Sequence, residues 1–190
     1  MTQRRIYQEE YPYFVTFRTK QGYSLFEDAE MAVLLVDIMF NAGTLKQYDI
    51  LAYQIMPEHV HVLVYQKNVD NIHRAQASLP ALLCLDGRAP TPACLLSQTA
   101  GREGCARRNF NISQLVHAIK SYFCDAIRDH YNIKYPVFQK RFYTRIITTR
   151  KYLRTVIQYI KYNPIKAELP HKYYHPPYQY FDWNKISKLF

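Results

Sequence analysis

The sequence predicts an α+β fold in which a ferredoxin-like βαββαβ antiparallel sheet is followed by a C-terminal helix. Three observations predict it: short segments of alternating polarity typical of strands, longer segments with apolar residues at helical spacing, and the order in which these follow one another. The 190 residues fit one domain with a buried core. Two helices would cover one face of the sheet, and the other face would be open.

The first third of the chain supplies a strand, a helix and a hairpin. The predicted elements are a strand at 11–20, a helix at 28–43, and strands at 45–55 and 59–65. Asp28 is a suitable N-cap for the helix, and Gly43 is a suitable C-cap. The turn Met56-Pro57-Glu58 would join the last two strands, because proline favours a tight turn and donates no ladder hydrogen bond.

An irregular segment, residues 68–109, separates the two halves of the predicted fold. It holds three of the five glycines, three of the ten prolines and three of the four cysteines. We interpret it as an insertion with a short helix at 75–85. The cysteines form no C-x-x-C pair, which argues against a zinc ribbon and for free thiols.

Regular periodicity returns after the insertion. The predicted elements are a helix at 112–129, a strand at 137–148 and a helix at 150–163 that ends at Pro164. The tail at 171–190 then holds seven aromatic residues with interleaved lysines. Such a tail could form stacking platforms for bases, or it could wrap back over the core, and the sequence alone leaves both open.

The net charge of +10 is concentrated in one block. Residues 101–163 carry 13 basic and 3 acidic side chains, whereas residues 1–100 carry 8 and 10. Such a block favours a polyanionic partner, because each neutralised phosphate releases condensed counterions. The 18 tyrosines and 10 phenylalanines add faces on which unpaired bases can stack. No segment is predicted to span a membrane or to act as a signal peptide, so we expect a cytoplasmic protein.

Two histidines of the strand at 59–65 point to a metal site. Side chains alternate along a strand, so His59 and His61 share one face while Val60, Val62 and Val64 share the other. If the valines face the helices, both imidazoles lie on the open face, where they could converge on one divalent ion. The alternative is a pair of surface or network histidines, since a lone H-x-H is a weak motif.

The last predicted helix supplies a tyrosine and an amide. Tyr159 and Asn163 are four residues apart and therefore lie one above the other on one helix face. Docked over the open face, the helix could offer Asn163 as an oxygen ligand and place the Tyr159 hydroxyl beside the ion. A phenol is a poor nucleophile at neutral pH, but polarisation of a scissile phosphate by a metal lowers that requirement. The alternative is a helix tyrosine that packs on the core, and Tyr143, Tyr152 and Tyr162 are rival nucleophiles.

Five segments together resemble the HUH single-tyrosine transposases of insertion sequences, and most closely the REP-associated tyrosine transposases. They are YFVTFRTK, MPEHVHVLV, ISQLVHAIKSYF, VFQKRFYTRII and YIKYNPIKAEL, in family order over residues 11–170. The second and the last are specific when they occur together at this separation, and the others are weaker. The segment 68–109 is longer and more irregular than the family pattern.

The resemblance implies a mechanism and a set of site residues. His59, His61 and Asn163 match ligands of Mg²⁺ or Mn²⁺, and Tyr159 matches the nucleophile. The implied substrate is single-stranded DNA near hairpins, cleaved to a 5′-phosphotyrosine and a free 3′-hydroxyl. The NP context of Asn163 is similar to the REP-associated branch, whose members tend to be monomers, while other relatives are dimers that swap this helix.

Basic residues near the predicted nucleophile are the candidates for DNA binding. They are Lys120, Lys140, Arg141, Arg145, Arg150 and Arg154. Lys120, in IKSYF, matches a recurrent position of the family. A solvated charged face is the alternative for single lysines and arginines. Two other functions also remain open: a binding module that has lost the chemistry, and a metal-dependent nuclease that uses water, with Tyr159 structural.

Overall fold

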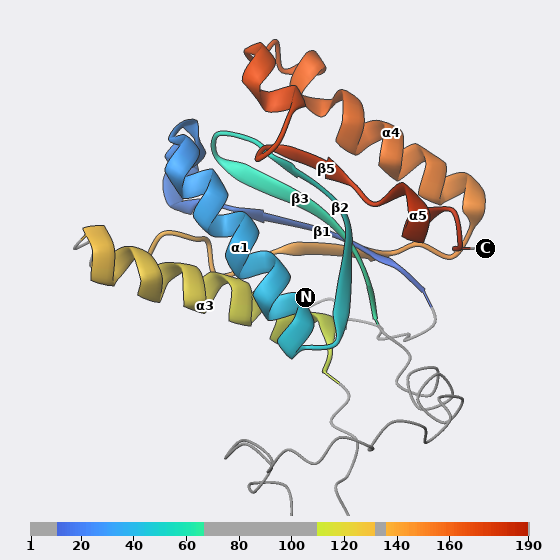
Figure 1. Cartoon of the computed structure of the whole chain (residues 1–190), viewed down its shortest axis with the longest axis horizontal. Coiled ribbons are helices and arrows are strands. Elements are labelled where there is room, and N and C mark those ends of the chain that lie inside the picture. Colours follow the sequence, from blue (N-terminus) through green and yellow to red (C-terminus); the bar gives the residue numbers. More distant parts are fainter. Residues whose placement is uncertain (1–10, 67–109, 132–135, 190) are drawn as a thin grey trace, which may run out of the picture. The chain divides into compact units, whose positions relative to one another are not determined.

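The computed structural model describes residues 11–66, 110–131 and 136–189 (Figure 1). All of these belong to the unit formed by residues 1–67 and 110–190. Residues 68–109 form a second unit outside the described residues. The predicted insertion, with its helix at 75–85 and Cys84, Cys94 and Cys105, therefore lies outside the described part of the chain.

A five-stranded antiparallel sheet forms the centre of the described unit, in the order β4-β1-β3-β2-β5. The strands are β1 (Tyr13–Arg18), β2 (Tyr48–Ile55), β3 (His59–Gln66), β4 (Tyr143–Ile146) and β5 (Gln179–Phe181). Short 3-10 turns, η1 (Lys20–Gly22) and η2 (Leu25–Glu27), follow β1. The predicted hairpin of β2 and β3 is confirmed by their antiparallel pairing and by the Met56 N–H, which donates to the His59 carbonyl at 2.8 Å.

The strand predicted at 137–148 is wrong in length, because β4 spans Tyr143–Ile146 alone. The preceding residues make other contacts. Phe138 forms an isolated bridge with Thr19, and the Lys120 ammonium donates to the carbonyls of Gln139 and Arg141 at 2.8 and 3.3 Å. These two carbonyls therefore accept hydrogen bonds from a lysine side chain.

One face of the sheet packs against α1 (Ala29–Leu45) and α3 (Ile112–Tyr131) (Figure 1). Val60, Val62 and Val64 of β3 are buried in this cluster, as their alternation predicted. The predicted N-cap is confirmed, since the Asp28 carboxylate accepts from the Glu30 N–H at 2.9 Å.

Gly43 lies inside α1, so its prediction as the C-cap is wrong. The helix continues to Leu45, and Lys46 is the C-cap. A Cβ at position 43 would come within 2.9 Å of the Tyr48 carbonyl oxygen. The glycine therefore permits close approach of β2 to the helix and does not terminate it.

The opposite face, predicted to be open, is covered by α4 (Arg150–Lys166) and α5 (Trp183–Ile186) (Figure 1). A second apolar cluster joins Phe14 and Leu63 of the sheet to Leu153 and Ile160 of α4. The predicted end of α4 is also wrong, because the helix continues through Pro164 to Lys166. The buried Pro164 donates no backbone hydrogen bond, and the helix continues past it for two residues.

The aromatic tail wraps back over the core. It forms η4 (His171–Tyr174), β5 and α5, and Tyr173 and Tyr178 are each 2% exposed. For these two side chains, the structure therefore supports the interpretation in which the tail packs on the core. Across the described residues, no helix is both long enough and apolar enough to span a membrane.

Candidate active site

A row of polar side chains crosses the sheet on the face that α4 covers. The strand register pairs Gln179 with Gln54, Gln54 with His61, His61 with Thr16, and Thr16 with Tyr143. Paired residues of antiparallel strands point to the same face, so the row forms one continuous stripe. Gln54 and His61 are 0% and 3% exposed, and buried polar groups of this kind need partners.

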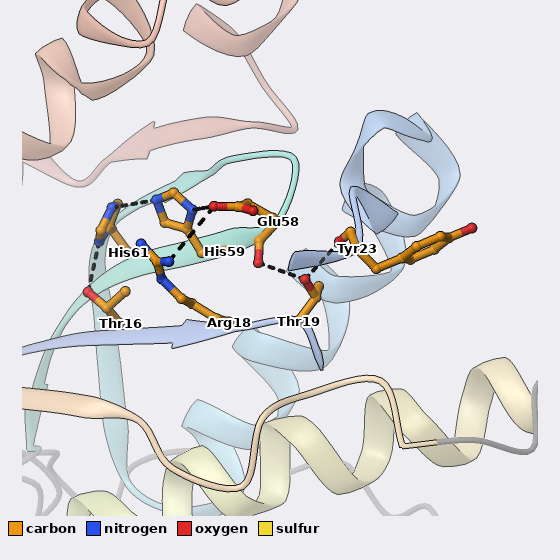
Figure 2. Close-up of polar contacts among 7 residues, drawn as sticks. All are labelled: Thr16, Arg18, Thr19, Tyr23, Glu58, His59 and His61. Atoms are coloured by element: carbon orange, nitrogen blue, oxygen red, sulfur yellow. Dashed lines mark hydrogen bonds and ion pairs between the residues drawn. The ribbon is translucent and has the colours of Figure 1, made fainter. Parts of the chain in front are cut away.

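The two histidines converge at their Nε2 atoms, which lie 3.1 Å apart (Figure 2). Their ring centroids are 4.8 Å apart with an angle of 81° between the ring planes. His59 lies at the start of β3 beside the hairpin turn, and its side chain is 13% exposed. The period of two along β3 therefore brings both imidazoles to one point, as the sequence predicted.

The surroundings of both histidines favour the neutral imidazole. Burial, together with the smaller effects of the nearby His59 and Arg18, lowers the pKa of His61 to about 3. Burial also lowers the pKa of His59, as does Arg18, while Glu58 opposes the shift. At neutral pH each ring therefore has one nitrogen lone pair that can bind a cation.

Thr16 and Glu58 approach the other nitrogen of each ring (Figure 2). Thr16 Oγ1 lies 2.8 Å from His61 Nδ1, and Glu58 Oε1 lies 3.6 Å from His59 Nδ1. The Glu58 carboxylate also lies 3.9 Å from Arg18 Nη1. If the Nδ1 atom of each ring carries the proton, the lone pair of each ring lies on Nε2, which is the arrangement that binding one cation through both Nε2 atoms requires.

Tyr159 packs against the more buried histidine of this pair, His61. Its ring meets the His61 ring edge-on with centroids 5.1 Å apart, and it meets Phe14 at 5.9 Å. Phe14 in turn stacks on His61 at 5.6 Å. Tyr159 is 42% exposed, so a solvent-borne substrate can reach it.

The rival tyrosines lie elsewhere. Tyr143 contacts Phe14, Tyr152 hydrogen-bonds to Arg145, and Tyr162 lies beneath the Lys161 ammonium. Among the contacts between described residues, the ring of Tyr159 alone of the four touches His61. The structure therefore brings together three of the four predicted residues: His59, His61 and Tyr159.

Asn163 lies one turn beyond Tyr159 on α4 and is half-buried. Its Nδ2 atom is buried and has no hydrogen-bond partner among the described residues. The amide nitrogen is a donor and binds no cation, so the Asn163 oxygen is the atom that could act as a ligand. No contact joins Asn163 to either histidine in the described part of the chain, so its role as a ligand stays a prediction.

The donors present fit a divalent ion. Two ligand atoms about 2.1 Å from an octahedral ion, at right angles, lie about 3.0 Å apart, close to the Nε2 separation. No three His, Cys, Asp or Glu side chains of the described ranges gather into a metal cluster. Further ligands would therefore be an amide oxygen, as Asn163 could supply, or water. Nitrogen ligands suit a transition ion, which makes Mn²⁺ a better match than Mg²⁺.

The predicted DNA-binding residues divide into two groups. Lys140, Arg141, Arg145, Arg150 and Arg154 are exposed. Lys120 is half-buried and holds the carbonyls of Gln139 and Arg141, with its ammonium 5.5 Å from the Phe142 ring. The structure thus gives Lys120 a role in fixing the approach to β4, and its contact with DNA stays a prediction.

Sequence reasoning missed Thr16, Glu58 and the second pair of histidines, His171 and His175. The Nε2 atoms of that pair lie 3.3 Å apart on an exposed turn. Their spacing of four residues was a visible signal. No pattern within β1 marks Thr16, because its role depends on the register with β3.

The fold is shared by the solved structure of a transposase. A REP-associated tyrosine transposase bound to a REP hairpin matches with a TM-score of 0.62 and 17% identity, over 100% of this chain and 88% of that chain. A candidate transposase from Deinococcus radiodurans r1 matches with a TM-score of 0.37 and 17% identity, over 89% and 98%. The first match supports a mixed α/β fold with an open antiparallel sheet, as in a transposase. Neither a protein-family model nor a curated protein matches the sequence.

Proposed function

We propose that this protein is a metal-dependent endonuclease and strand-transferase of single-stranded DNA, a REP-associated tyrosine transposase. The observation that carries the proposal is the contact of the Tyr159 ring with His61, whose Nε2 faces that of His59 at 3.1 Å. The shared fold supports it. So does the strand order β4-β1-β3-β2, which a ferredoxin-like βαββαβ chain adopts, with β5 added at one edge.

Each residue has a distinct role in the proposed chemistry. His59, His61 and Asn163 would hold Mn²⁺ or Mg²⁺, which when bound polarises the scissile phosphate. The Tyr159 oxygen attacks phosphorus and its proton passes to solvent. The bond from phosphorus to the 3′-oxygen breaks, and that oxygen takes up a proton from water. The products are a 5′-phosphotyrosine and a free 3′-hydroxyl.

The phosphotyrosine makes rejoining feasible without an external energy source. It retains a phosphodiester bond, so a different 3′-hydroxyl can attack it and release Tyr159. DNA hairpins near the cleavage site would be held by the exposed basic residues. Because α4 packs on the sheet of its own chain, one chain brings His59, His61 and Tyr159 together.

A denaturing protein gel tests the proposal. The full chain is incubated with Mn²⁺ and a hairpin-bearing single strand labelled at its 3′ or its 5′ end. A 5′-phosphotyrosine predicts that the 3′ label joins the protein and the 5′ label leaves on a free fragment. Tyr159→Phe should abolish the adduct, whereas the matched Tyr162→Phe, at a 45% exposed position on the same helix, should retain it.

Two other results would favour the rival functions. Cleavage without any adduct indicates a hydrolytic nuclease in which Tyr159 is structural. Binding with neither cleavage nor adduct indicates a module of the same fold that only holds nucleic acid. Metal titrations use a His171→Gln/His175→Gln background, so that the exposed histidine pair does not contribute binding.

A further inference from the structure

A groove of about 290 Å³ runs between α4 and α5, outside the site described above. Its lining includes Arg150, Arg154, Ile157, Gln158, Trp183 and Ile186. On the circumference of α4, Arg150 and Ile157 lie about 160–180° from Tyr159, at 100° per residue. The groove and the Tyr159 ring therefore lie on opposite flanks of the same helix.

The groove combines an apolar floor with an exposed indole. Ile186 is 7% exposed and, with Leu153, belongs to the apolar cluster beneath α4. Trp183 is 54% exposed and stacks on Phe181 with ring centroids 5.0 Å apart and planes 14° apart. An indole fixed in this way is a rigid platform on which another flat ring can stack.

The charges around the groove are positive and unneutralised. Arg150 and Arg154 are exposed, and neither forms an ion pair with any described residue. The sequence of α4, RKYLRTVIQYIKYNPIK, contains five basic residues and no acidic residue. Asp182 is adjacent to Trp183, but its carboxylate accepts from the Lys185 N–H and lies 3.6 Å from the Lys185 ammonium. The groove therefore suits a ligand with a flat apolar ring and an anionic group.

We propose that this groove binds one nucleotide of single-stranded DNA, with its base on Trp183 and its phosphate between Arg150 and Arg154. Such a pairing of aromatic stacking with backbone contacts is how proteins hold single strands without reading their sequence. The volume is at the lower end of ligand sites and suits one nucleotide. The inference rests on the proposed function in one respect, because the strand in the groove is the one that Tyr159 would cleave. To reach Tyr159, that strand would cross α4, a helix about 10–12 Å wide.

Intrinsic fluorescence tests the proposal, because Trp183 is the only tryptophan of the chain. The full chain is titrated in EDTA, which prevents cleavage, with a 12-residue oligo-dT, a duplex of equal length, or heparin. Oligo-dT should quench the fluorescence saturably. Heparin, a polyanion without bases, should compete without quenching, and the duplex should quench weakly because its bases are already stacked.

Fluorescence anisotropy of a labelled oligo-dT measures how much Trp183 and the two arginines each contribute to the affinity. Trp183→Ala should raise Kd at least fivefold, and Arg150→Gln/Arg154→Gln should raise it at least tenfold. Lys46→Gln/Arg128→Gln is the matched control, because it removes the same charge from the α1 and α3 side, and it should change Kd less than threefold. Circular dichroism verifies that each variant is folded.

The outcomes separate this inference from the proposed function. If oligo-dT binds without quenching Trp183, or if heparin quenches equally, while a hairpin-bearing strand and Mn²⁺ still give the adduct on Tyr159, the nucleotide groove is wrong and the nickase proposal stands. A variant at Trp183 or at the two arginines with unchanged Kd also overturns it. Saturable quenching in a protein that never forms an adduct supports the groove and contradicts the nickase.

Discussion

Thr16 and His61 occupy paired positions on β1 and β3, and Thr16 Oγ1 lies 2.8 Å from His61 Nδ1. This contact restrains the orientation of the more buried imidazole. In the tautomer in which Thr16 accepts from Nδ1–H, the His61 Nε2 lone pair is directed at His59. Loss of a group that holds the far side of a metal-binding histidine typically costs about 10–100-fold in metal affinity.

Replacing Thr16 by valine should therefore weaken Mn²⁺ binding. Valine keeps the shape of threonine and removes the hydroxyl, so the expected loss is about 10–100-fold in affinity. Isothermal titration in the His171→Gln/His175→Gln background measures it. Thr44→Val, which alters an exposed threonine on α1, is the control and should have no effect. Equal affinities in both variants would show that Thr16 does not orient the metal-binding ring.

Replacing Asn163 by alanine should weaken metal binding and leave the stability of the protein nearly unchanged. Its buried Nδ2 has no partner among the described residues, so Asn163→Ala removes no hydrogen bond that the folded protein makes there. We expect the free energy of unfolding in urea to change by less than about 1 kcal/mol. Mn²⁺ affinity and adduct formation should both fall at least tenfold. A large loss of stability with normal metal binding would instead assign Asn163 a structural role.

His59 and His61 should make the protein less stable as the pH falls. The unfolded chain takes up a proton on each histidine near pH 6.5, whereas burial lowers the pKa of His61 to about 3 and also lowers that of His59. Below pH 6.5 the unfolded state thus binds more protons, and stability decreases towards pH 3. For His61 the slope approaches about 1.4 kcal/mol per pH unit within that window, and it vanishes above pH 6.5.

Urea unfolding in EDTA at pH 7.5, 5.5 and 4.5 measures this slope. Carboxylates also titrate at the low end, so the comparison is between variants. His61→Gln should flatten the dependence between pH 5.5 and 4.5 by about 1 kcal/mol. His117→Gln, at an exposed position on α3, should leave it unchanged. If stability changes with pH in the same way in the wild type and in His61→Gln, the claim that His61 is buried in its neutral form is contradicted.

The tail should stabilise the site through Gln179. Its amide donates to the Gln54 side chain at 2.7 Å and to the Lys161 carbonyl of α4 at 3.1 Å. Gln179→Ala leaves the oxygen of the fully buried Gln54 unpaired, which should cost about 1–3 kcal/mol of stability. Gln139→Ala, at an exposed position, should cost less than about 0.5 kcal/mol. Hydrogen exchange should also become faster in α4 of Gln179→Ala and not of the control.

The sequence predicted which face of the sheet a side chain occupies better than it predicted the strand register or the ends of the elements. Alternation along β3 placed the valines and the histidines on opposite faces, and the spacing of Tyr159 placed it over the histidine face. Alternation assigns a side chain to a face but does not identify its cross-strand neighbour. The contact of Thr16 with His61 therefore had no sequence signal.

The tail shows a second limit of sequence reasoning. Buried Tyr173 and exposed Trp183 belong to the same aromatic run, and composition alone cannot separate a residue that fills the core from one that faces solvent. The strand β5 is three residues long, too short for a period to be recognised. Pro164 was misread because proline disfavours a helix interior without forbidding it, and α4 continues past Pro164 to Lys166 with one backbone hydrogen bond fewer.

Peptide mapping of the covalent adduct tests the central claim most directly. Trypsin cuts after Arg154 and Lys161, so Tyr159 is the only tyrosine of the peptide TVIQYIK, while Tyr143, Tyr152 and Tyr162 fall in separate peptides. After reaction with a hairpin-bearing single strand and Mn²⁺, nuclease trimming leaves a nucleotide on the attacked residue. We predict that mass spectrometry finds the nucleotide on TVIQYIK. A nucleotide on another tyrosine peptide, or cleaved DNA with no modified peptide, would contradict the account.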